Sequence, residues 1–269
     1  MADGKHILAI DVGNTRAKFG LFRQTLAKNP EPLEIAARIL NETADVASAF
    51  YDWWLNLGVD PPDVAMVAAS DPETRDLLVQ SWPIHGCRPI IIFGFRQIPV
   101  GVDVDSPERV GVDRLLNAFA GSQMSEPGRP VIVVDSGTAT TVDLVTSDAT
   151  FRGGSILPGL RLSAHAMHDY TARLPLLNVD EELTELPLLP GRNTEAAMRA
   201  GLFVGQLGAV KELIARLSLA AVNQFAENSR PQIFVSGGGG RQLVSHLEDA
   251  SFVDSLPLHG LAMLNASEF

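Results

Sequence analysis

Two segments of the chain place a carboxylate, a glycine and small polar residues directly after an aliphatic run. The first reads Ile-Leu-Ala-Ile-Asp-Val-Gly-Asn-Thr over residues 7–15, and the second reads Val-Ile-Val-Val-Asp-Ser-Gly-Thr over residues 131–138. A buried strand that ends in this way delivers one carboxylate to its end, and the glycine lets the backbone turn sharply against a ligand. Because the pattern occurs twice, it predicts two related halves that face one polyanionic ligand, and it favours a nucleotide.

The first of these loops has groups that can bind nucleotide phosphates. Gly13 and the amides after it can cradle phosphate oxygens, Thr15 can donate a hydroxyl, and Lys18 can neutralise charge. Asp11 can hold Mg²⁺ directly or through water. The alternative is a simple turn between two strands, in which the polar side chains only satisfy the backbone.

The second loop allows the same two interpretations. Its carboxylate, Asp135, can serve a second cation or the Mg²⁺ of the nucleotide. A third glycine-rich segment, Ser236 to Gly240, comes after an aliphatic strand and removes side chains where a base or a phosphate must approach closely. A flexible turn is the alternative for this segment, which gains weight only beside the other two loops.

The best candidate for a catalytic group is Asp113, within the sequence Gly-Val-Asp-Arg of residues 111–114. We expect these residues at a junction between a loop and a helix, where the carboxylate is accessible. It can accept the proton of an attacking hydroxyl, while Arg114 holds an anionic group of the substrate. The alternative is that Asp113 only caps the helix and that Arg114 is a solvated surface residue.

The composition argues against several other classes of protein. The 269 residues carry a formal net charge of −11, and no basic stripe is visible that would neutralise a nucleic-acid backbone. The single cysteine, Cys87, cannot form an internal disulfide, which favours a reducing compartment. The polar start lacks a signal-peptide core, and no apolar run approaches the ~18–20 residues of a membrane span. We therefore expect a cytoplasmic protein with no nucleic-acid or membrane partner.

The elements that must carry these residues alternate between strands and helices. Residues 7–22 read as a hairpin in which Ala17, Phe19 and Leu21 share one face. The rest of the first half contains strands at residues 64–69 and 90–93, helices at residues 45–57 and about 113–120, and an irregular stretch at residues 99–111. An exposed connection at residues 125–130 predicts the boundary between a first domain of residues 1–127 and a second of residues 128–269.

The second half repeats the strand, loop and strand and continues into a long helix. Asn193 is the expected N-cap of this helix, and Gly201 and Gly205 within it indicate close helix packing, between subunits. The apolar stripe of the helix comprises Phe203, Leu207, Val210, Ile214 and Leu217. The other elements are strands at residues 131–135, about 141–145 and 232–235, a loop at residues 153–159 and a helix at residues 241–247. Together they imply a mixed α/β architecture of two halves.

With these motifs in place, the chain resembles the type III pantothenate kinases of the acetate and sugar kinase, Hsp70 and actin superfamily. The resemblance covers nearly the whole chain, and the motifs occur in the family's order. They lie at residues 11–18 (first phosphate loop), 111–114 (Gly-x-Asp-Arg), 135–139 (second phosphate loop), 153–159, 171–175, 193–194 and 258–261. The resemblance implies an α/β fold of two ribonuclease H-like, actin-like half-domains with a nucleotide cleft between them.

The same resemblance implies ATP-dependent phosphorylation of the primary hydroxyl of pantothenate to 4'-phosphopantothenate, the first step of coenzyme A biosynthesis. Asp113 would be the general base on this hydroxyl, and Asp135 would bind the monovalent cation, K⁺ or NH₄⁺, that the family uses. ATP and its Mg²⁺ would contact Thr138 and the first loop, namely Asp11, Val12, Gly13, Asn14, Thr15, Arg16, Ala17 and Lys18. Pantothenate would contact Gly111, Val112, Asp113, Arg114 and Thr194.

The resemblance further implies a homodimer with the active site near the subunit interface, where Thr194 would come from the neighbouring subunit. Many members carry an aromatic residue with a hydroxyl three positions before the proline that precedes Gly-x-Asp-Arg, and this chain has Val104 there. That departure bears on the affinity for pantothenate more than on the chemistry.

Two other functions compete with this one. The first is a nucleotide-binding regulatory protein of the same fold without useful turnover, against which Asp113 and both Asp-x-Gly loops argue. The second is a kinase of the superfamily that acts on a sugar or a carboxylate, which the Gly-x-Asp-Arg loop disfavours.

Overall fold

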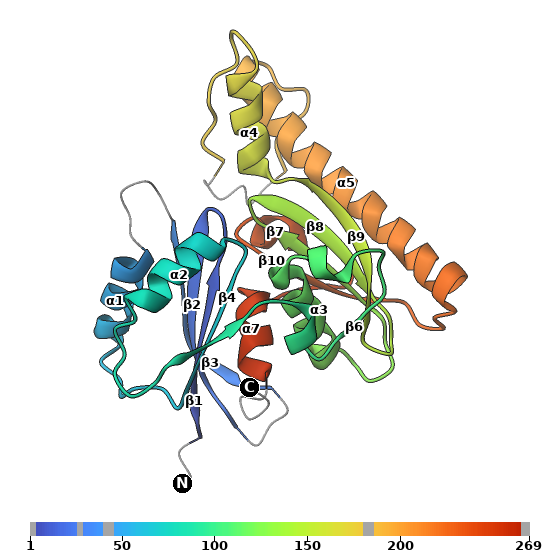
Figure 1. Cartoon of the computed structure of the whole chain (residues 1–269). Coiled ribbons are helices and arrows are strands. Elements are labelled where there is room, and N and C mark those ends of the chain that lie inside the picture. Colours follow the sequence, from blue (N-terminus) through green and yellow to red (C-terminus); the bar gives the residue numbers. More distant parts are fainter. Residues whose placement is uncertain (1–3, 26–28, 40–45, 180–185, 265–269) are drawn as a thin grey trace. The chain divides into compact units, whose positions relative to one another are not determined.

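In the computed structural model, the chain forms two compact units (Figure 1). The structure describes residues 4–25, 29–39, 46–179 and 186–264. The first unit comprises the chain up to Met124 together with the C-terminal segment from Ser255, and the second comprises Ser125–Asp254. The C-terminal segment therefore lies in the first unit, whereas the expected second domain ran to residue 269. The reason is that α7 (Leu256–Met263), whose side chains are nearly all buried, packs against β1 and α3.

The first unit is built on a sheet with the strand order β3-β2-β1-β4-β5. Its first three strands are antiparallel neighbours, and the last two continue the sheet parallel to β1. The strands are β1 (His6–Val12), β2 (Arg16–Arg23), β3 (Glu31–Ile39), β4 (Val64–Ala69) and β5 (Pro89–Ile92). The remaining elements are α1 (Val46–Leu57), α2 (Pro72–Gln80), η1 (Phe95–Gln97), β6 (Gly101–Val102), η2 (Pro107–Arg109) and α3 (Val112–Met124).

The hairpin of the first unit is confirmed, including the face that it buries. Ala17, Phe19 and Leu21 are at most 3% exposed. The ring of Phe19 lies 5.3 Å from that of Phe50 and 5.5 Å from that of Trp53, both on α1. These aromatic contacts anchor α1 on the sheet. The expected start of this helix at residue 45 lies outside the described residues.

Among the longer elements of the first unit, β3, α2 and the C-terminal helix α7 were not expected from the sequence. β3 lacks an apolar run, and all its side chains from residue 31 to residue 38 are exposed or half-buried. α2 is short and mostly exposed, with only Leu78 buried. Its start nevertheless obeys the usual rule, because the Asp71 carboxylate accepts the N–H of Glu73 and a proline occupies the first helical turn.

The sheet of the second unit contains the strand order β11-β10-β7-β8-β9, which repeats the order of the first unit. β7 (Val131–Ser136), β8 (Ala139–Val145) and β9 (Thr150–Pro158) are antiparallel neighbours. β10 (Gln232–Ser236) and β11 (Ala250–Phe252) run parallel to β7. The helices are α4 (Leu160–Asp169), α5 (Thr194–Phe225) and α6 (Gly240–Val244). In each unit the first strand pairs with the second and the fourth, which confirms two related α/β halves.

The expected loop at residues 153–159 is wrong, because residues up to Pro158 continue strand β9. A Cβ atom on Gly154 would collide with the carbonyl oxygen of Val142 and the carboxylate of Asp143 on β8. Glycine is therefore required here by the close approach of two strands, next to a register irregularity between Asp143 and Val145. Only Gly159 lies beyond the strand, where it precedes α4.

The long helix α5, visible in Figure 1, has the expected N-cap and a buried apolar stripe where the sequence predicts one. The Asn193 carboxamide oxygen accepts the N–H of Ala196 at 2.8 Å. Phe203, Leu207 and Val210 are at most 6% exposed, and Ile214 and Leu217 pack against the same core. Among the helices that the structure describes, none has the length and apolar character needed to cross a membrane.

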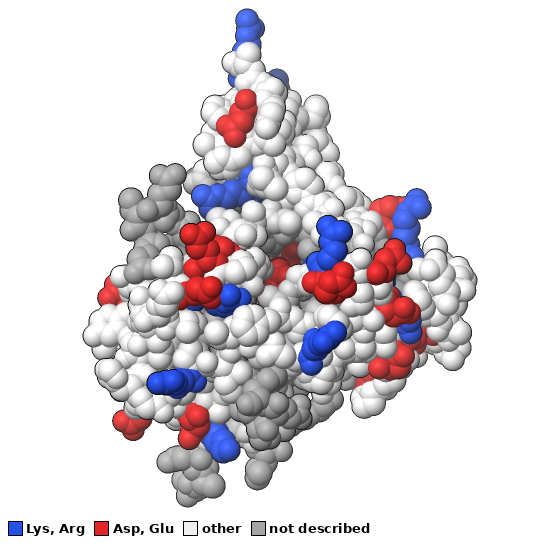
Figure 2. All heavy atoms as spheres, in the orientation of Figure 1, with Lys and Arg blue, Asp and Glu red and all other residues white. Residues whose placement is uncertain are grey.

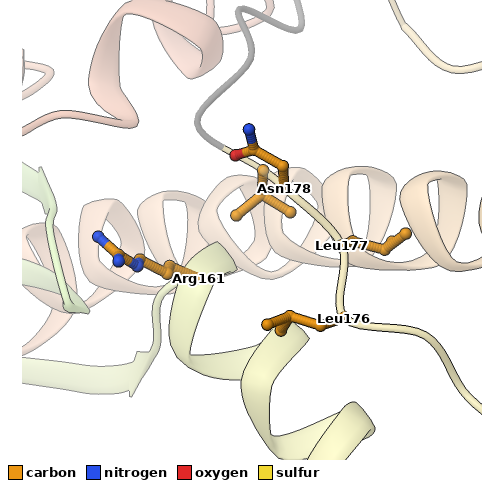
Figure 3. A pocket seen from close by; sticks show the side chains of 5 residues that line it. Arg161, Leu176, Leu177 and Asn178 are labelled. Carbon is orange, nitrogen blue, oxygen red and sulfur yellow. The ribbon is translucent and has the colours of Figure 1, made fainter.

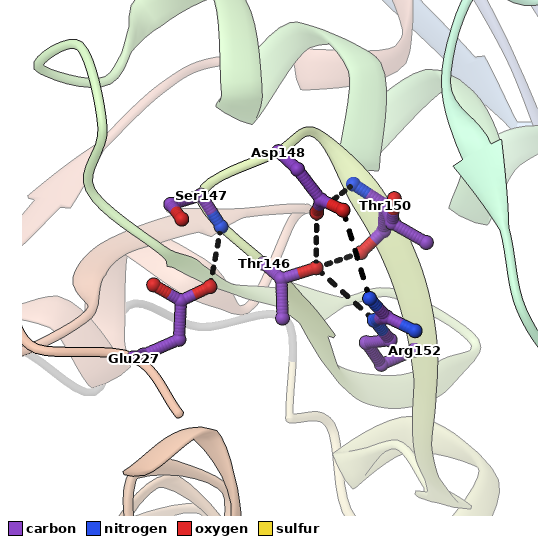
Figure 4. A network of polar contacts seen from close by, with 6 residues as sticks. All are labelled: Thr146, Ser147, Asp148, Thr150, Arg152 and Glu227. Carbon is purple, nitrogen blue, oxygen red and sulfur yellow. Dashed lines mark hydrogen bonds and ion pairs between the residues drawn. The ribbon is translucent and has the colours of Figure 1, made fainter. Parts of the chain in front are cut away.

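A polar network joins the turn between β8 and β9 to the chain just after α5 (Figure 4). The Thr146 hydroxyl donates to the Asp148 carboxylate at 2.6 Å, and the Glu227 carboxylate accepts the N–H of Ser147 at 2.7 Å. Arg152 completes the network, with a guanidinium nitrogen 3.7 Å from the Asp148 carboxylate. The hydrogen bond from Thr146 lowers the pKa of Asp148 below its usual value, so the network stabilises the charged carboxylate.

This network predicts a specific acid sensitivity of the fold. Because the pKa of Asp148 is lowered in the folded state, its contribution to stability is present above the unfolded pKa of about 3.9 and is lost as the pH falls through the folded pKa. The free energy of unfolding of the variant Asp148→Asn should therefore fall less steeply than that of the wild type as the pH is lowered below about 4. Urea unfolding at stepped pH measures this, with the exposed Asp169→Asn as the matched control. Identical slopes for wild type and Asp148→Asn would contradict the prediction.

Candidate active site

The first Asp-x-Gly loop joins β1 to β2 and brings three of the predicted residues together. Asp11 and Lys18 are direct partners across the antiparallel ladder. Lys18 Nζ lies 3.6 Å from Asp11 Oδ2, and the Asp11 side chain is only 5% exposed. The N–H of Gly13 donates to the carbonyl of Arg16 at 2.9 Å and closes the turn. A nearly buried carboxylate thus lies beside an ammonium group at the end of a strand, where a phosphate and a metal ion can approach.

The other residues of this loop divide into two groups. Asn14 is exposed, and Thr15 and Arg16 are half-buried, so their side chains can reach a ligand. Val12 and Ala17 are fully buried and can offer only backbone groups.

The second Asp-x-Gly loop joins β7 to β8 in a similar way, but its turn is one residue shorter than the first. Asp135 pairs across the ladder with Thr141, as Asp11 pairs with Lys18. The N–H of Gly137 donates to the carbonyl of Ala139 at 3.0 Å, which closes this turn. The Thr141 hydroxyl oxygen is buried and makes no hydrogen bond within the described residues. A hydroxyl residue is therefore paired with the carboxylate at the ladder position where the first unit has a lysine, and carboxylate and hydroxyl oxygens suit a hard cation.

The third glycine-rich segment lies against the second loop. Gly237 has a φ of +85°, and a Cβ atom there would lie 2.5 Å from Asp135 Oδ1. The N–H of Gly239 donates to the carbonyl of Ser136 at 2.9 Å. Glycine is required at position 237 both by the backbone angle and by the contact with the carboxylate. The two loops thus form one continuous backbone surface in the second unit.

Thr138 lies at the exposed tip of the second loop, and its backbone is held by a further glycine. The N–H of Gly159 donates to the Thr138 carbonyl at 3.0 Å. A Cβ atom at Gly159 would collide with the carbonyl oxygens of Gly137 and Thr138. The Thr138 side chain is exposed and can contact a ligand.

Asp113 lies in the first turn of α3, at the junction that the sequence predicts. A Cβ atom on Gly111 would collide with Asp113 Oδ1, so glycine lets the carboxylate fold back over the loop. The carbonyl of Gly111 accepts the N–H of Leu115 at 3.3 Å, which places the loop directly on the helix. Asp113 and Arg114 are both half-exposed, while Val112 is buried.

Two further positions from the sequence lie outside these loops. Thr194 is the first residue of α5, exposed and next to the capping Asn193. Val104, which replaces the family's aromatic residue, is half-buried shortly before η2.

A buried polar cluster beneath the second loop was not expected from the sequence. Gln206 Nε2 donates to Thr140 Oγ1 at 2.5 Å and to Ser136 Oγ at 3.4 Å. The signal for this cluster in the sequence is a glutamine on the same face of the helix as Phe203 and Val210.

Two further features to compare with the predicted site are a cavity and the distribution of charge on the surface. A cavity of about 240 Å³ in the second unit is lined by Arg161, Leu176, Leu177, Asn178 and Val179, and no residue predicted for the site is among them (Figure 3). On the face shown in Figure 2, basic and acidic side chains of the described residues are interspersed and form no continuous basic stripe.

Known structures share this fold. A Baf family protein of Campylobacter jejuni, which carries the name of a transcriptional activator, has a TM-score of 0.59 at 18% identity, and the match covers 97% of this chain and 98% of that one. Component A of the (R)-2-hydroxyglutaryl-CoA dehydratase of Acidaminococcus fermentans has a TM-score of 0.53 at 13% identity over 98% of both chains. At such identities the likeness establishes the fold alone.

Comparison with relatives in sequence identifies the family as well as the fold. The profile of the type III pantothenate kinase family matches residues 7–216. A type III pantothenate kinase of Dinoroseobacter shibae is 33% identical over 97% of this chain and 98% of its own length, and one of Listeria monocytogenes is 30% identical over 96% of both. Both the profile and these relatives cover the segments in which the two Asp-x-Gly loops and the Gly-x-Asp-Arg motif lie. The chain therefore belongs to the type III pantothenate kinase family.

Proposed function

We propose that this protein transfers the γ-phosphoryl group of ATP to the primary hydroxyl of pantothenate with Asp113 as the general base. Membership of the family supports a kinase that acts on pantothenate in coenzyme A biosynthesis. The observation that carries the assignment of the base is the half-exposed Asp113 carboxylate at the start of α3, folded back over Gly111. A carboxylate held in this way can accept the proton of the attacking hydroxyl.

In this proposal the first loop binds the phosphates of ATP. The backbone amides after Gly13 and the Lys18 ammonium group would hold phosphate oxygens, and Asp11 would hold Mg²⁺. Mg²⁺ neutralises the charge that develops on the transferred phosphoryl group. Because such a transition state needs little covalent help, the residues of the loop act by positioning and by charge. Thr138, exposed on the second loop, would contact ATP from its own unit.

The second loop would hold a monovalent cation, K⁺ or NH₄⁺, at Asp135. The comparison of the two ladders supports this assignment: Lys18 lies beside Asp11 in the first unit, and Thr141 takes the equivalent place beside Asp135. The residue opposite the first carboxylate thus carries a positive charge, whereas the residue opposite the second carries a hydroxyl whose oxygen makes no hydrogen bond within the described residues. A bound cation would supply the positive charge that the lysine supplies in the other unit.

The substrate would be held by the residues of the Gly-x-Asp-Arg motif and by Thr194. Pantothenate carries a carboxylate, and the guanidinium group of Arg114 fits a carboxylate with two hydrogen bonds. Gly111 and Val112 would contribute backbone groups, since one has no side chain and the other is buried.

We also place two copies of the chain in a homodimer that packs through α5, with the active site near the interface. Gly201, Gly205 and Gly208 are exposed along the helix, and a Cβ atom on any of them would meet no atom within 4 Å. Such a face lets two helices approach closely. Thr194 at the start of this helix would then serve the neighbouring subunit.

The assignment of the base is tested by the variant Asp113→Asn. The wild type with ATP, Mg²⁺ and K⁺ should form phosphopantothenate, and the variant should lose about 10²- to 10⁴-fold in kcat because it lacks the proton acceptor. Calorimetry should show unchanged ATP binding, and the exposed Asp105→Asn, in the same segment, is the control. Full activity of Asp113→Asn would remove this residue from the role of base, and no product from the wild type across several monovalent cations would refute the kinase assignment.

The cation assignment is tested by placing an ammonium group opposite Asp135. The variant Thr141→Lys should reduce the dependence of kcat/KM for ATP on added K⁺, because its side chain places a positive charge beside Asp135 as Lys18 does beside Asp11. Thr141→Met has a long side chain without the charge and should not gain activity in the absence of K⁺. A wild type that is indifferent to exchange of K⁺ for Na⁺ would contradict a monovalent site at Asp135.

The dimer is tested by filling the glycine face. Gly205→Leu should shift the mass in solution from twice 28.9 kDa towards 28.9 kDa, as measured by light scattering, because leucine separates the two helices. Ala215→Leu, exposed on the same helix about three turns nearer to its end, is the matched control. A wild type that is monomeric would refute the homodimer, and a Gly205→Leu variant that stays dimeric would refute this interface.

A further inference from the structure

The buried cluster of Ser136, Thr140 and Gln206 is not part of the function proposed so far. Thr140 is 0% exposed, Ser136 is 3% exposed and Gln206 is 7% exposed. Gln206 Nε2 donates to both hydroxyl oxygens, at 2.5 Å to Thr140 and at 3.4 Å to Ser136. These groups lie in the core between α5 and the strands β7 and β8, at the ends of those strands that carry the second Asp-x-Gly loop.

A polar cluster at this position stabilises the fold less than apolar side chains would. Burial of an amide and two hydroxyls is unfavourable unless each group is fully hydrogen-bonded. The Gln206 carbonyl oxygen is buried and accepts no hydrogen bond within the described residues. Since the neighbouring positions Phe203, Leu207 and Val210 already dock the helix with apolar side chains, an apolar residue at position 206 would satisfy the packing of α5. The cluster therefore calls for an explanation other than stability.

Ser136 connects the cluster to two loops at once. It is the last residue of β7 and directly precedes Gly137 of the second Asp-x-Gly loop. Its carbonyl accepts the N–H of Gly239 at 2.9 Å, and a Cβ atom on Gly239 would lie 2.5 Å from Ser136 Oγ. Gln206 thus holds the hydroxyl of the residue at which both glycine loops of the second unit meet.

We propose that Gln206 is a positioning residue for the nucleotide: through Ser136 and Thr140 it fixes the spacing between the loop of Gly137 and the loop of Gly239. The inference rests on the proposed function, in which Thr138 of the second loop contacts ATP, and it adds the loop of Gly239 to the same nucleotide site. A binding site loses affinity for its ligand when the loops that line it are not held at a fixed spacing before binding. Gln206 touches neither loop's exposed surface, so it acts only through the residues that it holds.

The test replaces Gln206 by methionine, which is similar in length and has no hydrogen-bond donor. Gln206→Met should weaken ATP binding by about 5- to 30-fold, as measured by calorimetry, and should raise the KM for ATP similarly. The KM for pantothenate should stay within about twofold, because the Gly-x-Asp-Arg motif is not part of the cluster. Gln224→Met carries the same substitution on the exposed face of the same helix and should leave ATP binding unchanged.

A second pair of variants keeps the test independent of the fold of Gln206→Met. Thr140→Val removes the acceptor with almost the same volume, whereas Thr140→Ser retains the hydroxyl. Thr140→Val should weaken ATP binding as Gln206→Met does, and Thr140→Ser should restore most of it. Because both variants break the hydrogen bond between Gln206 and Thr140, the double variant Gln206→Met/Thr140→Val should bind ATP about as weakly as Gln206→Met alone.

The possible outcomes separate this inference from the proposed function. If the wild type phosphorylates pantothenate but Gln206→Met and Thr140→Val bind ATP as tightly as it does, the inference alone is overturned. If both variants lower the thermal midpoint and kcat while ATP binding stays the same, the cluster is merely structural and the inference fails. If the wild type binds ATP, the variants weaken that binding and no phosphopantothenate forms, the substrate assignment alone fails. A wild type that binds no nucleotide overturns both.

Discussion

The arrangement of both candidate loops depends on one constraint, the pairing of an aspartate with a residue directly across an antiparallel ladder. The register of β1 with β2 places Lys18 beside Asp11, and the register of β7 with β8 places Thr141 beside Asp135. A slip by one residue would move every side chain to the opposite face of the sheet. The alternation that buries Ala17, Phe19 and Leu21 prevents such a slip in the first unit. The packing of the core therefore decides which group lies beside each carboxylate.

The two units share this constraint and differ in the turn after the fourth strand of each. After β4, the chain turns through Asp71, which caps α2. After β10, the chain turns through glycines whose backbone packs on the Asp135 carboxylate and on Ser136. A capped helix start is closed by its own side chain, whereas the glycine turn has no side chains and its N–H groups at Gly239 and Gly240 are bonded to carbonyls of the chain. The repeated topology thus supports two loops at equivalent places with different lengths and environments, in line with the different roles proposed for Asp11 and Asp135.

The sequence predicted the parts of the fold in which burial and periodicity agree. The hairpin at residues 7–22, the strands β4, β7 and β10, and the stripe of α5 are buried elements with continuous apolar patterns. β3 and α2 were not predicted because their side chains are mostly exposed and show no apolar pattern. The end of β9 was predicted as a loop because of its glycines, although Gly154 is needed there for the close contact with β8. The exchange of Lys18 for Thr141 could be seen in the sequence, since it needs only the two motifs side by side. The contact of Gln206 with Thr140 could not, since it joins residues 66 positions apart.

The helix α5 carries several of the positions discussed above within the second unit. It carries Thr194 in its first turn and Gln206 twelve residues later, about 18 Å along the axis at 1.5 Å per residue. Beyond its last residue, Glu227 is hydrogen-bonded to the turn between β8 and β9, so the helix is anchored to the strand that begins at the second loop. The buried stripe and the bond of Glu227 thus hold α5 against the core of the second unit along its length. In the proposed function, the same helix carries a substrate contact at Thr194 and, at Gln206, a buried residue beneath the second loop. Its packing on the core therefore fixes the distance along the helix between these two positions.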